Sequence, residues 1–296
     1  MPGSIPASGT AELPTVAVPD VGVAQRGLLR RLATRPAGAV GIALTAVFVA
    51  AAVTAPVLAP ADPFAVDGPS LAAPSRHYLF GTDALGRDGL SGVLHGARTT
   101  LIVAAAVGAM VLVIGTTVGA VAGWLGGRVD DLLMRFTEFL QVLPRFFLAL
   151  MVIALFGPGI DRLILVLGLT SWALFARVVR AETLSLRERE FVEAARAAGS
   201  SGLRIVVQEI LPNALPAATV YLGLLLAQVM LIEASLGFLG LGDPNVMSWG
   251  RLAAEGQRFL RVAWWLAVFP GMAVVLAVLG LNLLADGLTR ALREGR

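Results

Sequence analysis

The sequence predicts an all-α integral membrane protein with six transmembrane helices, and three observations support this. Of the 296 residues, 57% are hydrophobic and only 15% are charged, whereas soluble domains average about 45–50% apolar and about 25% charged residues. The hydrophobic residues are gathered into runs near the length of about 20 residues that crosses a bilayer. The arginines lie mostly in the gaps between these runs, as in proteins whose loops set their membrane orientation. A soluble globule with a large core is therefore the less favoured fold.

The same composition argues against several kinds of functional site. The chain has no cysteine, so it offers no disulfide, thiol nucleophile or thiolate metal ligand. With only His77 and His95, a multi-histidine metal centre is not expected either. Because lysine is absent, the chain cannot contain the GxxxxGK[ST] loop that holds ATP phosphates. No span shows the arrangement of an intramembrane protease or acyltransferase, so we expect no catalytic residue, metal or cofactor in this chain.

The chain begins with a segment that is predicted to be a flexible cytoplasmic tail, residues 1–36. It lacks the basic region and apolar core of a cleaved signal peptide. Its last part carries a basic collar that is expected to stay on the cytoplasmic side, formed by Arg26, Arg30, Arg31 and Arg35. The remaining residues, 37–296, are predicted to form the transmembrane domain.

The first two predicted spans are uncharged. The first covers about residues 37–58 and is followed by a polar loop over residues 60–98. The second covers about residues 99–125, and its glycines repeat at a spacing of four or seven. This spacing favours close helix contact inside a membrane, and the glycines are Gly108, Gly115, Gly119 and Gly123.

The third predicted span, about residues 132–155, is interrupted by charges and a proline. At about 100° per residue, Arg135, Glu138 and Arg145 share one face, which we expect to point at a partner protein or an aqueous path. Pairing of these charges among themselves within the bundle is an equal alternative. Pro144 is expected to kink the helix or to end it, because it donates no backbone hydrogen bond.

The last three predicted spans differ in length. The fourth covers about residues 163–180, although its apolar run ends before Arg177, whose long side chain can reach toward water. The fifth covers about residues 210–232 and the sixth about residues 262–285. A glycine-rich polar loop over residues 233–261 separates them.

Six spans place both termini on the same side of the membrane, and the arginines test this topology. With cytoplasmic termini, 15 of the 23 arginines lie on the cytoplasmic side, seven lie outside and Arg145 lies within a span. This excess has the sign that the positive-inside rule requires, and a five-span topology would weaken it. The cytoplasmic arginines are at positions 26, 30, 31, 35, 128, 135, 177, 180, 187, 189, 196, 204, 290, 293 and 296, and the outer ones at 76, 87, 98, 162, 251, 258 and 261.

Between the fourth and fifth spans lies a charged, alanine-rich segment, residues 189–204, that is predicted to form a short helix. Phe191, Ala195 and Ala198 fall at i, i+4 and i+7 and give it one apolar edge. Gly199 suits the left-handed position that ends a helix. On periodicity alone, this segment is an ordinary amphipathic helix lying on the membrane surface.

Residues in and after this segment resemble the EAA loop of permease subunits in ATP-binding-cassette importers. They are Glu193, Ala194, Ala195 and Gly199, followed by Leu211 and Pro212. One position departs from the general pattern, because Glu209 stands where the superfamily has isoleucine. The peptide-importer branch commonly has the order Ile-Leu-Pro-Asn, which is found at residues 210–213. The resemblance implies that this helix docks into a groove of an ATPase subunit and transmits its motion.

The polar loop after the first span carries a second motif. Its glycines permit turns, and its charged residues can form a local network. The motif residues are Gly81, Thr82, Asp83, Gly86, Arg87 and Asp88. This stretch closely resembles the C-type permease subunit of dipeptide, oligopeptide and nickel importers. A folded outer lid without substrate contact is the favoured interpretation, and substrate recognition is the alternative.

Three further stretches resemble the same branch, residues 235–242, 248–250 and 264–271, so the resemblance extends over about residues 37–296. It implies the type I importer architecture, in an inner-membrane protein that forms half of a translocation path for peptides. The implied partners are a homologous second permease, two ATPase subunits that bind ATP and magnesium, an external substrate-binding protein and membrane lipid, but no nucleic acid. The alternatives are a nickel-chelate importer, a non-transporting membrane scaffold or an exporter-type channel.

Overall fold

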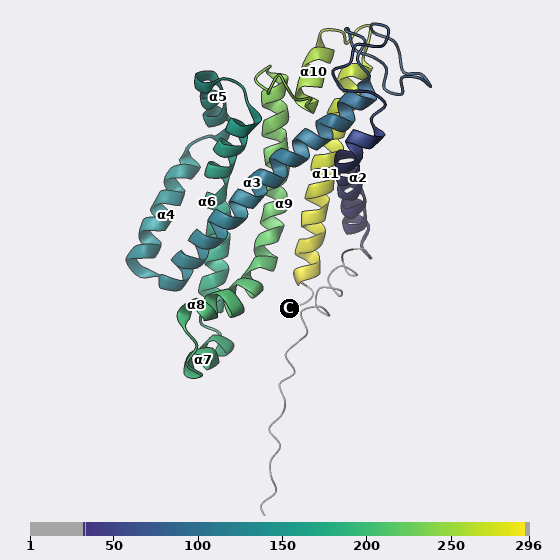
Figure 1. Cartoon of the computed structure of the whole chain (residues 1–296). Helices are drawn as coiled ribbons and strands as arrows, with labels where there is room; N and C mark the ends of the chain where they lie inside the picture. Colours follow the sequence, from purple (N-terminus) through teal and green to yellow (C-terminus); the bar gives the residue numbers. More distant parts are fainter. Residues whose placement is uncertain (1–31, 33, 294–296) are drawn as a thin grey trace, which may run out of the picture.

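The structure is a computed structural model that describes residue 32 and residues 34–293, and these residues form a bundle of helices (Figure 1). Within them, the only β-type pairing is an isolated bridge between Thr82 and Asp88. The predicted all-α class is confirmed. Most of the predicted N-terminal tail lies outside the described residues, as do residues 294–296.

Five helical segments are long and apolar enough to cross a membrane, and a bent pair of helices is a sixth candidate. The five are α2 (Pro36–Leu58), α3 (Gly89–Leu125), α6 (Ile160–Leu186), the run from α8 (Gly202–Ile205) through the π-helix η1 (Val206–Ile210) into α9 (Leu211–Phe238), and α11 (Trp265–Arg293). The bent pair is α4 (Gly127–Val142) and α5 (Arg145–Phe156). A multi-pass membrane protein is confirmed, with six crossings if the bent pair counts as one.

The helices run between two ends of the molecule (Figure 1). At the first, called the α7 end, lie the short helix α7 (Glu190–Ala197), α8 and the C-terminal end of α11. At the second, called the α10 end, lie α10 (Trp249–Gln257) and the loop over residues 59–88. Helix α3 runs diagonally from the α10 end to the α7 end, so one helix connects the two predicted motifs.

The third predicted span is two helices instead of one, because α4 and α5 are bent by 72°. The break falls at Leu143 and Pro144, which both have extended backbone dihedrals. Proline removes a helical hydrogen bond and disfavours helix in the residue before it, so the expected effect of Pro144 is confirmed. Arg145 starts a new helix and does not continue the face that carries Arg135 and Glu138.

Other helices extend beyond the predicted spans. Helix α3 begins at Gly89, and α6 continues to Leu186. Helix α9 continues to Phe238 and includes Glu233, which the sequence assigned to the following loop. Hydropathy marks only the part of a helix that crosses the membrane, whereas the helix itself continues while its backbone hydrogen bonds persist.

Helices α3 and α6 pack closely through glycines of α3. A Cβ added at Gly119 would lie 2.4 Å from the carbonyl oxygen of Ala176, and one at Gly123 would lie 2.7 Å from the Cβ of Thr183. No side chain fits in these places, so the predicted glycine repeat brings the two backbones together. Gly108 faces a leucine of α9 instead.

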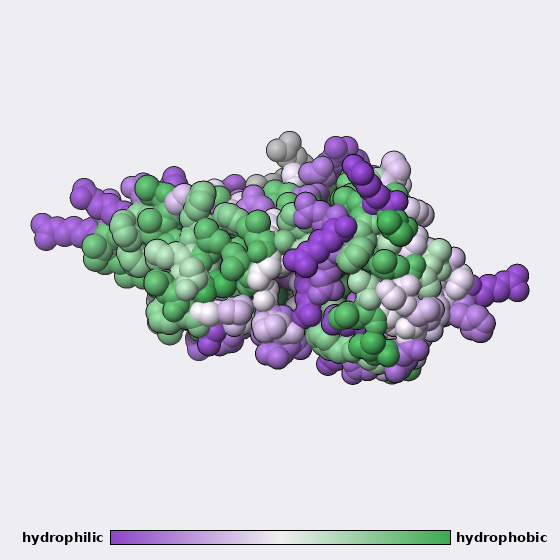
Figure 2. Space-filling model, turned by 90° about the horizontal axis from the view of Figure 1, so that it is seen from above, coloured by the Kyte–Doolittle hydropathy of each residue, from purple (hydrophilic) through white to green (hydrophobic). Residues whose placement is uncertain are grey.

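The flanks of the bundle are apolar. Large exposed apolar side chains occur on each long helix, for example Val53 on α2, Val113 on α3, Leu165 on α6 and Val275 on α11. Seen from the α10 end, a band of hydrophilic residues crosses the molecule between larger hydrophobic areas (Figure 2). Flanks of this kind suit lipid or partner helices as neighbours, and not water.

Candidate functional site

Helix α7 ends as the sequence predicts. The amide of Ser200 donates to the carbonyl of Ala195, and the amide of Gly199 donates to the carbonyl of Arg196, both at 3.0 Å. These two bonds form a Schellman motif. A Cβ at position 199 would meet no atom within 4 Å, so the φ of +82°, and not a lack of space, makes glycine the suitable residue.

One edge of α7 is buried and the opposite side is open. Val192 is fully buried and Ala195 is half-buried, whereas Phe191 and Ala198 are exposed. Of the three residues of the predicted apolar edge, Ala195 packs against the buried apolar cluster, whereas Phe191 and Ala198 lie on the open side. The open side combines acidic and small residues, so another protein could approach its backbone closely. The exposed residues are Glu190, Phe191, Glu193, Ala194, Arg196, Ala197 and Ala198.

Leu211 and Pro212 begin α9 directly after the π-helix η1. Leu211 packs against the same apolar cluster that contains Val192 of α7. Pro212 is exposed and cannot donate a backbone hydrogen bond, while the side-chain amide of Asn213 donates to the carbonyl of Glu209 at 2.7 Å. Helix α7 and the start of α9 therefore contribute to one apolar cluster, and a π-helix, of the kind that often occurs at functional sites, directly precedes α9.

Helix α7 and the residues before it contact the C-terminal end of α3. The guanidinium of Arg196 lies over the ring of Trp124, 5.0 Å from its centroid. Arg187 donates to the carbonyl oxygens of Gly123 at 3.0 Å and of Trp124 at 3.5 Å. These carbonyls are among those that a helix end leaves without a helical partner. The sequence analysis predicted none of these contacts.

An ion pair joins α4 to α6 at the same end. The carboxylate of Asp130 accepts two hydrogen bonds from the guanidinium of Arg180, and the Asp130 side chain is only 11% exposed. This pair was not predicted, because the two residues lie 50 positions apart in the sequence. The available signal was the presence of an arginine in an apolar span, where a charge usually has a partner.

The motif in the loop before α3 holds its own charges together. The carboxylate of Asp83 accepts hydrogen bonds from the amides of Leu85 and Arg87, both at 2.8 Å, and lies 3.8 Å from Nε of Arg87. Asp88 accepts a hydrogen bond from the amide of Ser91 at 2.7 Å and so caps α3. Of the predicted charge network, Asp83 and Arg87 thus form an ion pair, whereas Arg87 also lies 3.9 Å from Glu255 of α10 and Asp88 caps a helix instead.

The remaining motif residues fix the backbone of the loop. Gly81 and Gly86 have φ of +70° and +85°, and a Cβ at Gly86 would lie 2.1 Å from the carbonyl oxygen of Gly68. Thr82 is fully buried, and its hydroxyl accepts a hydrogen bond from the amide of Ala72 at 2.8 Å. Five of the motif residues thus hold the backbone of the loop or the start of α3, and Arg87 pairs with Asp83 and with Glu255 of α10, which favours a folded lid over direct substrate recognition.

The charged residues of the third predicted span lie on an open part of the molecule. Arg135 and Glu138 are exposed on α4, and Arg145 is half-buried at the start of α5. No ion pair joins these three side chains in the part of the chain that the structure describes. Arg145 interacts instead with the hydroxyl of Tyr221 on α9. The alternative of mutual pairing therefore gains no support, and a role at a partner or path surface stays a prediction.

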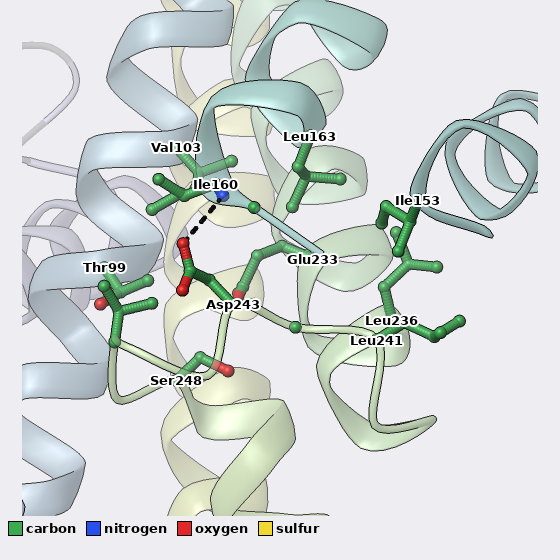
Figure 3. A pocket seen from close by; sticks show the side chains of 13 residues that line it. Thr99, Val103, Ile153, Ile160, Leu163, Glu233, Leu236, Leu241, Asp243 and Ser248 are labelled. Carbon is green, nitrogen blue, oxygen red and sulfur yellow. Dashed lines mark hydrogen bonds between the residues drawn. The ribbon is translucent and has the colours of Figure 1, made fainter. Parts of the chain in front are cut away.

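Glu233 of α9 is a buried acid that the sequence analysis missed. Its side chain is 5% exposed, and the hydroxyl of Thr100 on α3 donates to its carboxylate at 3.0 Å. It lines a small cavity together with Ser248 and Asp243 (Figure 3). Asp243 accepts a hydrogen bond from the amide of Ile160 at 3.3 Å, which ties the loop after α9 to the start of α6.

Helical spacing was the signal for Glu233. Leu225, Val229, Glu233 and Leu236 are all buried and follow one another at four, four and three residues, so one buried face continues past the first charge. Within residues 34–293, no group of three or more acidic or histidine side chains is placed to hold a metal ion. The site thus consists of helix contacts and buried polar pairs.

Comparison with known proteins identifies the family. Residues 115–295 match the family described as binding-protein-dependent transport system inner membrane component. The chain is 39% identical over 274 residues to a putative peptide transport system permease protein of Brucella suis, covering 92% of each chain. It is 35% identical over 270 residues to the dipeptide transport system permease protein DppC of Alkalihalophilus pseudofirmus, covering 90% of this chain and 88% of that one. It is also 39% identical over 219 residues to the oligopeptide transport system permease protein OppC of Escherichia coli K12, covering 74% and 72%. The chain therefore belongs to the family of binding-protein-dependent transport system inner membrane components.

Proposed function

We propose that this chain is a permease subunit of an ATP-driven peptide importer and forms half of its translocation path. The observation that carries the proposal is similarity over most of the chain to permeases that are named for peptide, dipeptide and oligopeptide transport. This similarity favours peptides over a nickel chelate as the substrate class. Family membership favours transport over a scaffold that moves nothing.

The importer needs further subunits. Because this chain has no lysine for an ATP-phosphate loop, two ATPase subunits bind ATP and magnesium and supply the energy, and the chain itself catalyses no reaction. A homologous second permease completes the path, and an external binding protein delivers the peptide. The description of the family as binding-protein-dependent supports this assignment.

Helix α7 couples the permease to the ATPase. Its open side, with Glu193, Ala194 and neighbouring alanines, is the surface that enters the ATPase groove, and Gly199 ends the helix so that this surface keeps its shape. Leu211 and Pro212 carry the movement into α9. When ATP closes the ATPase dimer, α7 moves with it and the spanning helices reopen to the other face.

The orientation follows from the coupling role. The α7 end faces the cytoplasm, both termini lie there, and residues 1–36 form a cytoplasmic tail before the permease domain of residues 37–296. The excess of arginines on that side supports this orientation. The loop over residues 59–88 then lies outside, where the binding protein arrives.

Replacement of Gly199 tests the coupling role. Gly199→Val places a β-branched residue at a φ of +82°, which distorts the end of α7 at a cost of about 1–2 kcal/mol without creating a clash. The variant is expected to insert and assemble, while ATP hydrolysis stimulated by substrate and binding protein falls. Hydrolysis by the purified, reconstituted complex is the measurement.

Gly240→Val is the matched control, because Gly240 has a φ of +78°, has open space around it and lies in the loop between α9 and α10. It carries the same backbone strain away from α7 and is expected to retain stimulated hydrolysis. If Gly199→Val assembles and its stimulated hydrolysis matches wild type, α7 is not the coupling element. Mass spectrometry of the small molecule that copurifies with the binding protein would separate peptides from nickel chelates.

A further inference from the structure

Two arginines contact the residues on either side of the turn between α3 and α4. Gly126 and Gly127 form the turn with φ of +65° and +54°. Arg187, between α6 and α7, donates to the last carbonyls of α3, and Arg180 of α6 pairs with Asp130 just after the turn. Positive charge is favourable at a helix C-terminus, so the first contact adds an electrostatic attraction to a hydrogen bond.

Trp124 lies between α7 and α8. The guanidinium of Arg196 covers its ring at 5.0 Å. A Cβ added at Gly202 of α8 would lie 3.1 Å from its Nε1, so the backbone of α8 also lies close to the ring. Trp124, near the end of α3, is therefore contacted by both α7 and α8, which belong to the segment proposed to contact the ATPase.

Beyond Trp124, α3 is packed against α6 without intervening side chains. Gly119 and Gly123 bring its backbone against α6, as described above. Such an interface resists sliding, because any shift presses backbone atoms together. A displacement applied at Trp124 is therefore passed to the α3–α6 pair as a whole.

We propose that Trp124, Arg187 and Arg196 form a clamp that makes α7 and the C-terminal end of α3 move as one body. This inference rests on the proposed function, because it names the route by which a displacement of α7 enters the membrane. Helix α3 has 37 residues and is capped at its other end by Asp88 of the outer-loop motif, so one helix carries the displacement to the α10 end. The three clamp residues are positioning residues and touch neither peptide nor nucleotide.

A distance measurement tests the clamp directly. Because the chain has no cysteine, spin labels can be attached at Val121→Cys on α3 and Arg189→Cys at the N-terminal end of α7, both exposed and the latter outside the proposed ATPase-contacting surface, in a complex with otherwise cysteine-free subunits. The distance between the labels is expected to be the same without nucleotide and with trapped ATP. In a Trp124→Leu background, which keeps apolar bulk but removes the ring, the distance is expected to change between the two states. A distance that changes with ATP in the parent complex, or one that Trp124→Leu leaves constant, overturns the clamp.

ATP hydrolysis provides an independent readout. In Trp124→Leu and Arg196→Gln, the ratio of substrate-stimulated to basal hydrolysis is expected to fall by roughly two- to fivefold, the effect of losing one exposed cation–π contact. Trp124→Phe and Arg196→Lys keep a ring face or a cation and are expected to restore part of the ratio. Failure of both conservative variants to restore it would contradict the clamp.

Two controls separate the clamp from general effects. Trp264→Leu removes an exposed tryptophan between α10 and α11. Arg204→Gln removes an exposed charge near α7 that has no recorded side-chain hydrogen bond or ion pair with the residues that the structure describes. Both are expected to keep the parent ratio. If Trp264→Leu lowers the ratio of stimulated to basal hydrolysis as much as Trp124→Leu does, the loss is a general effect of removing a tryptophan. Trp124 would then only anchor the chain at the membrane interface. If no peptide stimulates the parent complex, the proposed function fails, whereas the distance measured with ATP alone still decides the clamp.

Discussion

Single glycines in this chain are constrained by backbone conformation, by space or by both. Gly199 and Gly240 have positive φ and open surroundings, whereas Gly86 has positive φ and a neighbouring backbone in contact. The sequence predicts a helix end at Gly199 and a turn at Gly86. It cannot predict the contact at Gly86, because Gly68 reaches it only through the folding of the whole loop.

This difference leads to a stability prediction for two matched substitutions. Gly240→Ala adds only conformational strain, at a cost of about 1–2 kcal/mol. Gly86→Ala adds the same strain and also places a Cβ 2.1 Å from the carbonyl oxygen of Gly68, so the loop must shift. The melting temperature of the purified chain in detergent is expected to fall further for Gly86→Ala. Equal decreases would show that the loop adjusts freely and that the contact is not structural.

At the scale of secondary-structure elements, hydropathy predicted the spans and Pro144 predicted the break between α4 and α5. The side chains that pair between different helices could not be predicted in this way. Asp130 and Arg180 pair across 50 positions, and Glu233 finds Thr100 on another helix. Both pairs depend on how α3, α4, α6 and α9 pack against one another. No single stretch of the sequence reveals this packing. The sequence alone likewise does not indicate that Val192 is the fully buried residue of α7.

The open face of α4 gives a prediction about assembly. A charge facing lipid at the centre of a bilayer costs about 2.5–3.5 kcal/mol, so Arg135 and Glu138 are expected to face the second permease or the aqueous path. In the assembled complex, Glu138→Cys should resist a thiol reagent dissolved in the lipid, and the denatured complex should react fully. Arg145→Cys, at the start of α5, should behave in the same way. Reaction of both cysteines from the lipid, with none from water, would contradict the assignment.

At the scale of the whole molecule, the α4–α5 pair decides the topology. As a broken span it gives six crossings and places both termini on one side, whereas as a re-entrant loop it gives five and separates them. The contacts at its two ends differ. Just before α4, the last turn of α3 accepts hydrogen bonds from Arg187 at the α7 end. Just after α5, the amide of Ile160 donates to Asp243 of the loop before α10.

The pair is therefore expected to cross the membrane, and thiol labelling in intact cells can establish this. Pro158→Cys, exposed in the turn after α5, should react with a membrane-impermeant reagent added outside. Arg128→Cys, exposed beside the turn before α4, should react only after the membrane is permeabilised. Labelling of both from the same side would establish a re-entrant loop with five crossings. The C-terminal arginines would then lie outside, against the positive-inside rule, and α7 could not share a compartment with both termini. Labelling of the two cysteines from opposite sides would establish that the α4–α5 pair crosses the membrane. The chain would then have six crossings, and an even number is required for both termini to lie in the cytoplasm.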